Sequence, residues 1–173
     1  MYSVSSAYRT IKSTQSIPGD SLFLNAVWKI NIPPKVVIFC WRLHHNALAT
    51  VDNLRRRNIM LEEESNMYII WKEWYGWVAS ATVLPQDPVQ HFLQGPYTLQ
   101  SSTERKRWQV VWSAIAWNIW KQRNKCRFQR ETFNLQTLQS QIQSFAWAWL
   151  RMEKSFHYSF QQWANNPGAC IIY

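Results

Sequence analysis

The chain has 173 residues, of which 47% are apolar and 17% charged, and its 19 Lys and Arg against 10 Asp and Glu give a formal net charge of +9. This composition excludes wholesale disorder, and the excess of positive charge favours polyanionic partners. The four glycines form no phosphate-binding loop, the apolar runs stay short, and the three cysteines form no closely spaced pair. We therefore expect neither a P-loop enzyme, nor a membrane protein, nor a disulfide scaffold.

The first half of the chain predicts short helices separated by breaks. Apolar residues recur there at helical spacing, and Pro33-Pro34 ends one of the helices because a residue before proline avoids the helical region. The acidic run at residues 62–64 marks a second break. The expected helices cover residues 5–12, 21–30, 35–48, 51–58 and 66–81.

Residues 82–103 form the least regular stretch of the sequence, since they hold Pro85, Pro88, Gly95 and Pro96. At most one short turn of helix, around residues 89–93, is expected inside it. We interpret this stretch as a hinge between two lobes.

The second half predicts two long helices, residues 104–128 and 134–154. Ser102 or Thr103 can cap the first and Asn134 the second. Two helices joined by so short a link pack as an antiparallel hairpin. The apolar residues expected to share its core are Trp112, Ile115, Ile119, Ile142, Phe145 and Trp149.

The predicted fold class is therefore all-α, an irregular multi-helix domain that ends in a long antiparallel helical hairpin. Its expected parts are an N-terminal helical lobe at 1–81, the hinge at 82–103, a Trp-rich hairpin at 104–163 and a tail at 164–173.

The sequence offers no catalytic or metal-binding constellation. His44 and His45 are neighbours on a helix, so their side chains point about 100° apart and cannot converge on one metal. Cys40 lies on an apolar helix face and is expected to act as a small hydrophobic residue. No pair of aspartates is placed to hold the two metal ions of phosphoryl transfer. We expect no enzyme activity, no cofactor, no metal and no small-molecule substrate.

Basic residues gather in three clusters, which are the candidate nucleic-acid-binding residues. Lys and Arg at the end of a helix complement its dipole, and they also bind phosphates, so both interpretations stand. Tryptophans on the apolar stripes belong to the core more often than they stack on bases. The candidates are Arg55, Arg56, Arg57, Arg105, Lys106, Arg107, Lys121, Arg123, Lys125 and Arg127.

Three blocks of sequence carry recognisable motifs. Residues 2–8 read YSVSSAY, residues 28–43 read WKINIPPKVVIFCWRL, and residues 117–124 read WNIWKQRN. They resemble the F-x-V-x-S-A-Y opening, the W-x-x-x-[VI]-P-x-K-V-x-x-F-x-W-R-L core and the W-x-I-W-x-x-R-N signature of the zinc-binding region downstream of reverse transcriptase in plant LINE-type (non-LTR) retrotransposons. Residues 147–150 and 160–167 resemble the tail of such reading frames.

The sequence departs from that family where its zinc ligands belong. The family carries C-x-x-C and then E-[ST]-x-x-H-L-F-x-x-C after the arginine block. Here Trp71 follows Asn58 within thirteen residues, and residues 60–68 contain neither Cys nor His. Tetrahedral zinc needs thiolate or imidazole ligands, so the knuckle is interpreted as deleted and no ligand carries over.

Three functions remain open on this evidence. The first is a non-catalytic retrotransposon-derived module that binds RNA or DNA non-specifically through its basic clusters. The second is a protein-interaction or regulatory module, adopted by the host plant, that uses exposed aromatic surface. The third is a relic without selected function. An intracellular location, in nucleus or cytoplasm, is expected for each.

Overall fold

The structure, a computed structural model, describes residues 18–45, 64–80, 83–85, 87–129 and 131–173. Eight helices and no strands lie in this described part, which confirms the all-helical prediction. The expected helices at 5–12 and 51–58 lie outside it. The helices are α2 (Pro18–Lys29), α3 (Pro34–His44), α5 (Glu64–Trp77), α6 (Pro88–Gln94), α7 (Ser102–Gln129), α8 (Leu135–Leu150), α9 (Phe160–Asn165) and α10 (Pro167–Ile172).

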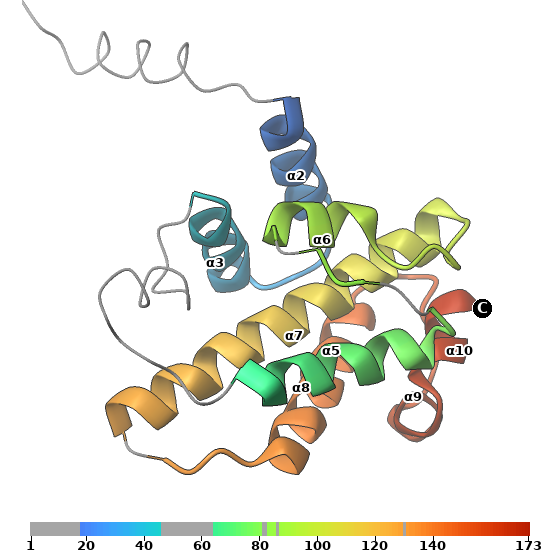
Figure 1. Cartoon of the computed structure of the whole chain (residues 1–173). Helices are drawn as coiled ribbons and strands as arrows, with labels where there is room; N and C mark the ends of the chain where they lie inside the picture. The colour runs from blue at the N-terminus through green and yellow to red at the C-terminus, as the bar shows by residue number, and fades with distance from the viewer. Residues whose placement is uncertain (1–17, 46–63, 81–82, 86, 130) are drawn as a thin grey trace, which may run out of the picture.

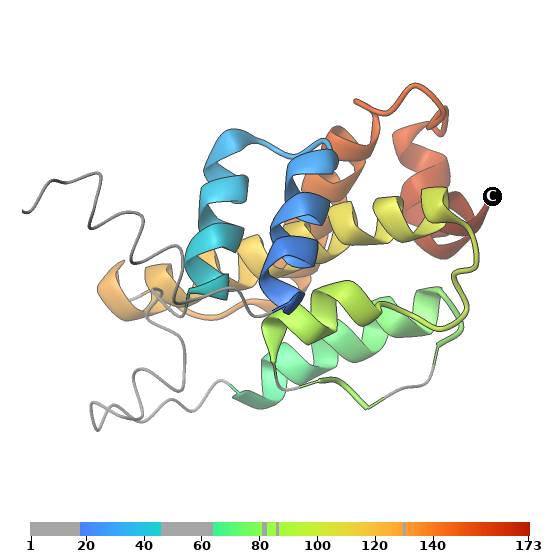
Figure 2. The same cartoon turned by 90° about the horizontal axis from the view of Figure 1, so that it is seen from above.

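Helix α7 runs through the middle of the molecule, and most other helices pack around it (Figures 1 and 2). Its most extensive contact is with α8, which confirms the predicted hairpin. Helix α7 is apolar on several sides. The sides that do not face α8 are therefore able to pack against α3, α6 and α10. No helix of the described ranges is both long and apolar enough to span a bilayer.

Local signals account for the start of both long helices. Asn134 accepts the Thr137 N–H at 2.9 Å, as predicted for a cap. At α7 the cap is Ser101, one residue earlier than predicted, because its Oγ accepts the Glu104 N–H at 3.1 Å. The Glu104 carboxylate in turn accepts the N–H of Gln100, the residue before the cap, at 2.8 Å and so fixes the entry of the chain into the helix.

Two helices end earlier than the periodicity predicts. Helix α5 stops at Trp77 rather than near residue 81, because Ala79 adopts a positive φ of 51°. The Ser80 N–H then bonds to the Tyr75 carbonyl, and the Ala79 N–H to that of Gly76, as in a Schellman ending. Helix α8 ends at Leu150 rather than near 154, and turn hydrogen bonds such as that from the Glu153 N–H to the Leu150 carbonyl follow it.

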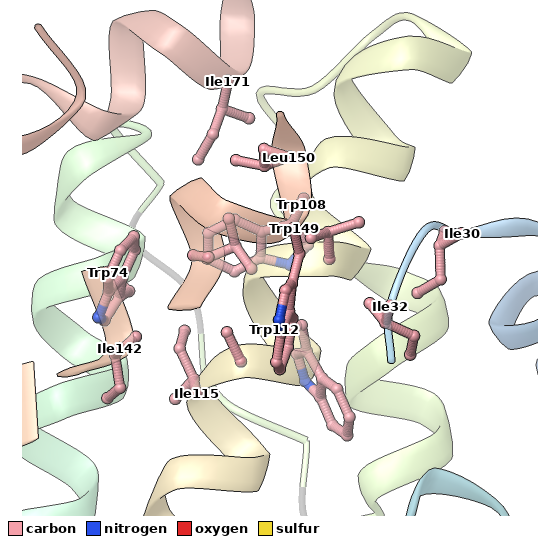
Figure 3. Close-up of a cluster of buried hydrophobic side chains, with 14 of the residues drawn as sticks. Ile30, Ile32, Trp74, Trp108, Trp112, Ile115, Ile142, Trp149, Leu150 and Ile171 are labelled. Atoms are coloured by element: carbon pink, nitrogen blue, oxygen red, sulfur yellow. The ribbon is translucent and has the colours of Figure 1, made fainter. Parts of the chain in front are cut away.

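The core is rich in tryptophan, and side chains from both predicted lobes form one buried cluster (Figure 3). Helix α6, inside the predicted hinge, packs against α2, α3 and α7. Of the six residues predicted to share the hairpin core, Ile119 and Phe145 are half-buried and pack against it. The four that are buried are Trp112, Ile115, Ile142 and Trp149.

The C-terminal residues differ from the expected tail. Pro167 starts a further helix, α10, whose Cys170 and Ile171 are buried. Gly168 permits this packing: a Cβ built there would lie 1.7 Å from the carbonyl oxygen of Trp77. The chain end therefore docks against the end of α5 and completes the core.

His91 of α6 is buried between aromatic rings. The ring centroid of Trp71 lies 4.4 Å away and those of Tyr75 and Trp112 lie 5.8 Å away. Burial disfavours the imidazolium and lowers the pKa of His91 to about 4, against an ordinary 6.5.

We therefore expect stability to fall with acid. Above pH 6.5 His91 is neutral in both states, whereas between about pH 6.5 and 4 only the unfolded chain takes up this proton. The loss amounts to about 3 kcal/mol once pH is below 4. Urea titrations at a series of pH values measure it.

The variant His91→Phe should flatten this acid limb, whereas replacing the exposed His157 by Asn should leave it unchanged. Burial raises the pKa of Glu73, which titrates in the opposite sense but equally in all three proteins. The same acid limb in His91→Phe as in the parent would contradict the assignment to His91.

Candidate nucleic-acid interface

The structure describes seven of the ten predicted basic residues. Arg55, Arg56 and Arg57 lie outside the described residues. Arg107 and Arg123 are buried, whereas Arg105, Lys106 and Arg127 are exposed and Lys121 and Lys125 half-buried. The structure therefore separates cations that can reach a ligand from cations that are enclosed.

Arg107 has a structural role. Only 5% of its surface is exposed, and its guanidinium bonds to backbone carbonyls. Its guanidinium donates to the carbonyls of Cys170 and Ile171 at 3.3 and 3.4 Å and to that of Ser155 at 3.3 Å. Its Nε lies 3.5 Å from a carboxylate oxygen of Glu153. These bonds tie α10 and the segment that follows α8 to α7, so this charge serves the fold.

The two exposed cations of the first cluster have different surroundings. Arg105 donates to the carbonyls of Leu99 and Gln100 at 3.3 and 3.4 Å, which holds the segment before α7. Lys106 borders a cavity of about 150 Å³ between α7, α8 and the link from α2 to α3, and Lys29 and Glu153 line it too. The Glu153 carboxylate makes this first cluster a weak anion site.

The second half of α7 forms a cationic surface together with α3 and α8. The Nζ of Lys35, at the start of α3, lies 6.0 Å from the ring centroid of Trp117. The Nζ of Lys121 lies 5.2 Å from the ring centroid of Phe145 on α8. Lys125, one turn further along α7, pairs with Glu131 at 3.3 Å. We call Lys35, Lys121 and Lys125 the lysine cluster.

Aromatic rings lie beside these lysines. Trp117 and Trp120 are half-buried and stacked, with ring centroids 5.2 Å apart. Phe39 of α3 supports both from the core side, at 5.3 and 5.4 Å. Phe39 covers the core side of both indole rings, and the rings are only partly buried. Their remaining surface is therefore exposed to solvent next to the lysine ammonium groups.

The lysines are close enough to influence one another. Burial first, and then the positive charges of Lys125 and Lys35, lower the pKa of Lys121. The positive charges repel one another in the free protein, and a bound polyanion reduces this repulsion. The cluster is therefore suited to binding phosphates. The local sequence signals Lys121 and Lys125, but Lys35 was missed because only helix packing brings α3 to this part of α7.

The chain's matched region is its N-terminal part. Residues 2–74 match the family model for zinc-binding in reverse transcriptase. This agrees with the resemblance seen in the motifs, and the region includes α2, α3 and most of α5. Lys35 lies inside the matched region, whereas Lys121 and Lys125 lie beyond it. The searches of curated proteins and of solved structures gave no significant match.

The donors in the matched region do not fit zinc. Residues 2–74 contain one cysteine and two histidines, Cys40, His44 and His45. Cys40 is buried in the core, and burial raises the pKa of its thiol to about 12, far from the thiolate that binds metal. The ring of His44 packs on Phe23 at 5.2 Å. Nowhere in the described ranges do three His, Cys, Asp or Glu side chains gather as a metal site would require.

Proposed function

We propose that this protein is a non-catalytic, retrotransposon-derived helical module that binds single-stranded nucleic acid without sequence preference. The observation that carries the proposal is the lysine cluster beside the stacked Trp117 and Trp120. Cationic side chains track the phosphates of a single strand, and aromatic faces stack on its bases whatever their identity. The match of residues 2–74 to a region associated with reverse transcriptase agrees with such a ligand.

The arrangement of charge supports a contact with several consecutive phosphates. The three lysines come from two helices and converge on one surface, so they present separate positive charges along it. Lys125 is held by Glu131 only through an exposed ion pair, which is worth little and is readily exchanged for a phosphate. Base stacking contributes about 1–3 kcal/mol per base in such proteins.

The proposal is tested by removing the lysine cluster in Lys35→Gln/Lys121→Gln/Lys125→Gln. Fluorescence anisotropy with a labelled single-stranded oligonucleotide follows affinity over a range of salt concentrations. For the parent we expect log affinity to fall linearly with log salt, by about 0.7 per phosphate. The triple variant should bind at least about tenfold more weakly near 150 mM salt, with a slope smaller by about two.

A matched control lowers the net charge by the same amount at other places. Lys72→Gln/Arg151→Gln/Lys154→Gln removes three positive charges from exposed positions outside the basic clusters. If both triple variants lose affinity equally, binding reflects net charge and the lysine cluster is not the site. If the parent shows no salt-dependent binding at all, the proposed function is wrong.

A second candidate function has its own observation. Ile38 and Trp41 lie exposed one turn apart on α3, and Leu22 and Trp28 are exposed on the neighbouring α2. Large apolar side chains exposed on adjacent helices are a feature of protein-binding surfaces when they form a contiguous patch. Nucleic-acid binding unaffected by the lysine substitutions, together with loss of a partner in Trp41→Ala, would favour this alternative.

A further inference from the structure

Lys121 has two like-charged neighbours and an apolar ring around its ammonium group. Its side chain is half-buried on α7, and its Nζ lies 5.2 Å from the ring centroid of Phe145 on α8. Lys125 follows one turn later on α7, and Lys35 comes from α3. The positive charges of both act on Lys121. Three amines from two helices are thus held together by the packing of α3 and α8 on α7.

The three helices around Lys121 offer it no carboxylate. Helices α3 and α8 contain neither Asp nor Glu. Helix α7 contains only Glu104, in its first turn, and at the rise of an α-helix this residue lies about 25 Å from Lys121. Glu131, which follows α7, is already paired with Lys125. The repulsion among the three amines is therefore not offset at Lys121 by an acidic partner from these helices.

These surroundings favour the neutral form of the Lys121 amine. Burial and the two neighbouring charges each disfavour the ammonium, and they lower the pKa of Lys121. The attraction between the ammonium and the Phe145 ring acts in the opposite direction but is weak at a partly exposed site. A neutral lysine amine is a nucleophile, and a lysine is activated in this way by burial or by another cation beside it.

We propose that Lys121 is the preferred N-acylation site of this protein and that its acylation weakens nucleic-acid binding by the lysine cluster. The inference rests on the proposed function and adds a regulation of the same site. The Nζ lone pair attacks the carbonyl carbon of a thioester, the C–S bond breaks, the thiolate leaves, and the amine proton passes to solvent. The amide product carries no charge, so one phosphate-binding cation is lost.

The first test measures the reactivity of each lysine in the free protein. The full chain reacts briefly with a small acetyl thioester at neutral pH, and the remaining amines are then acetylated to completion with an isotopically heavy reagent. Mass spectrometry of peptides gives the fraction modified at each position. Lys121 should react at least about threefold faster than the exposed Lys72 and Lys154. Equal or slower reaction at Lys121 overturns the site.

A pair of variants tests the like-charge origin of this reactivity. Lys35→Gln/Lys125→Gln removes both repelling charges and should slow the reaction of Lys121 by about twofold or more. Lys72→Gln/Lys154→Gln removes two charges from exposed positions elsewhere and should leave the rate at Lys121 unchanged. A difference in exposure alone would not produce this contrast. An unchanged rate in Lys35→Gln/Lys125→Gln overturns the role of the neighbouring charges.

The second test measures the effect of acylation on binding. Thioester treatment should lower the affinity of the parent protein for a single-stranded oligonucleotide by about threefold or more, as expected for one lost phosphate contact. Lys121→Arg keeps a positive charge that cannot be acylated, so treatment should reduce its affinity less, each protein being compared with its own untreated sample. Equal losses in both proteins overturn the regulation. Absence of binding by the untreated parent overturns the proposed function and the regulation with it, whereas the rates in the free protein still decide whether Lys121 is the acylation site.

Discussion

Replacing Trp112 by alanine should lower the free energy of unfolding by roughly 3–5 kcal/mol. Trp112 lies in the middle of α7 with 1% of its surface exposed, and its ring contacts Phe92, Trp71 and His91. The truncation removes the transfer free energy of the indole and leaves a cavity lined by residues of α5 and α6. Urea unfolding followed by circular dichroism measures the loss.

Trp28→Ala is the matched control, since this indole is 70% exposed. The same truncation at the surface should change stability by no more than about 0.5 kcal/mol. Equal losses for Trp112→Ala and Trp28→Ala would show that Trp112 is not enclosed by α5, α6 and α7.

Gly168→Ala should destabilise the protein by about 3 kcal/mol or more. The added Cβ would lie 1.7 Å from the carbonyl oxygen of Trp77, which belongs to the end of α5 and cannot rotate away. Helix α10 must therefore move, and the buried Ile171 and the bonds from Arg107 to the last carbonyls are disturbed. Overpacking usually costs about 1–3 kcal/mol, and the lost docking adds to it.

Two measurements check this prediction. Urea unfolding gives the loss of stability, and amide hydrogen exchange over residues 160–173 reports the release of α10. Gly76→Ala is the matched control, because nothing lies within 4 Å of a Cβ at Gly76. There the substitution in α5 should be neutral or stabilising by up to about 1 kcal/mol. Slow exchange of α10 amides in Gly168→Ala would contradict the role of this close contact.

The helical hairpin shows what periodicity predicts well. Apolar residues at helical spacing predicted α7 and α8 to within a few residues, and Asn134 marked the start of α8. The endings were less accurate, since α5 is closed by Ala79 at positive φ and alanine carries no signal for that conformation. Local propensity therefore describes helix starts better than ends that depend on tertiary contacts.

The candidate site was only partly predictable. Lys121 and Lys125 stood out as part of a basic run, but the same pattern included Arg123, which is buried. Arg107 also sits in a basic cluster, yet its guanidinium binds carbonyls from residues more than forty positions away. A run of charges in sequence does not tell which side chains turn inward, because that depends on the backbone that surrounds them.

The amino-acid sequence by itself determined the helical class, the hairpin and the apolar face of each long helix, since these follow from a repeat along one helix axis. Only the tertiary structure decided that Lys35 joins Lys121 and Lys125, that α10 docks at Gly168 against the end of α5, and that Arg107 is enclosed. Helical periodicity orients a side chain about its own axis, whereas the neighbour that it meets is set by how separate helices pack.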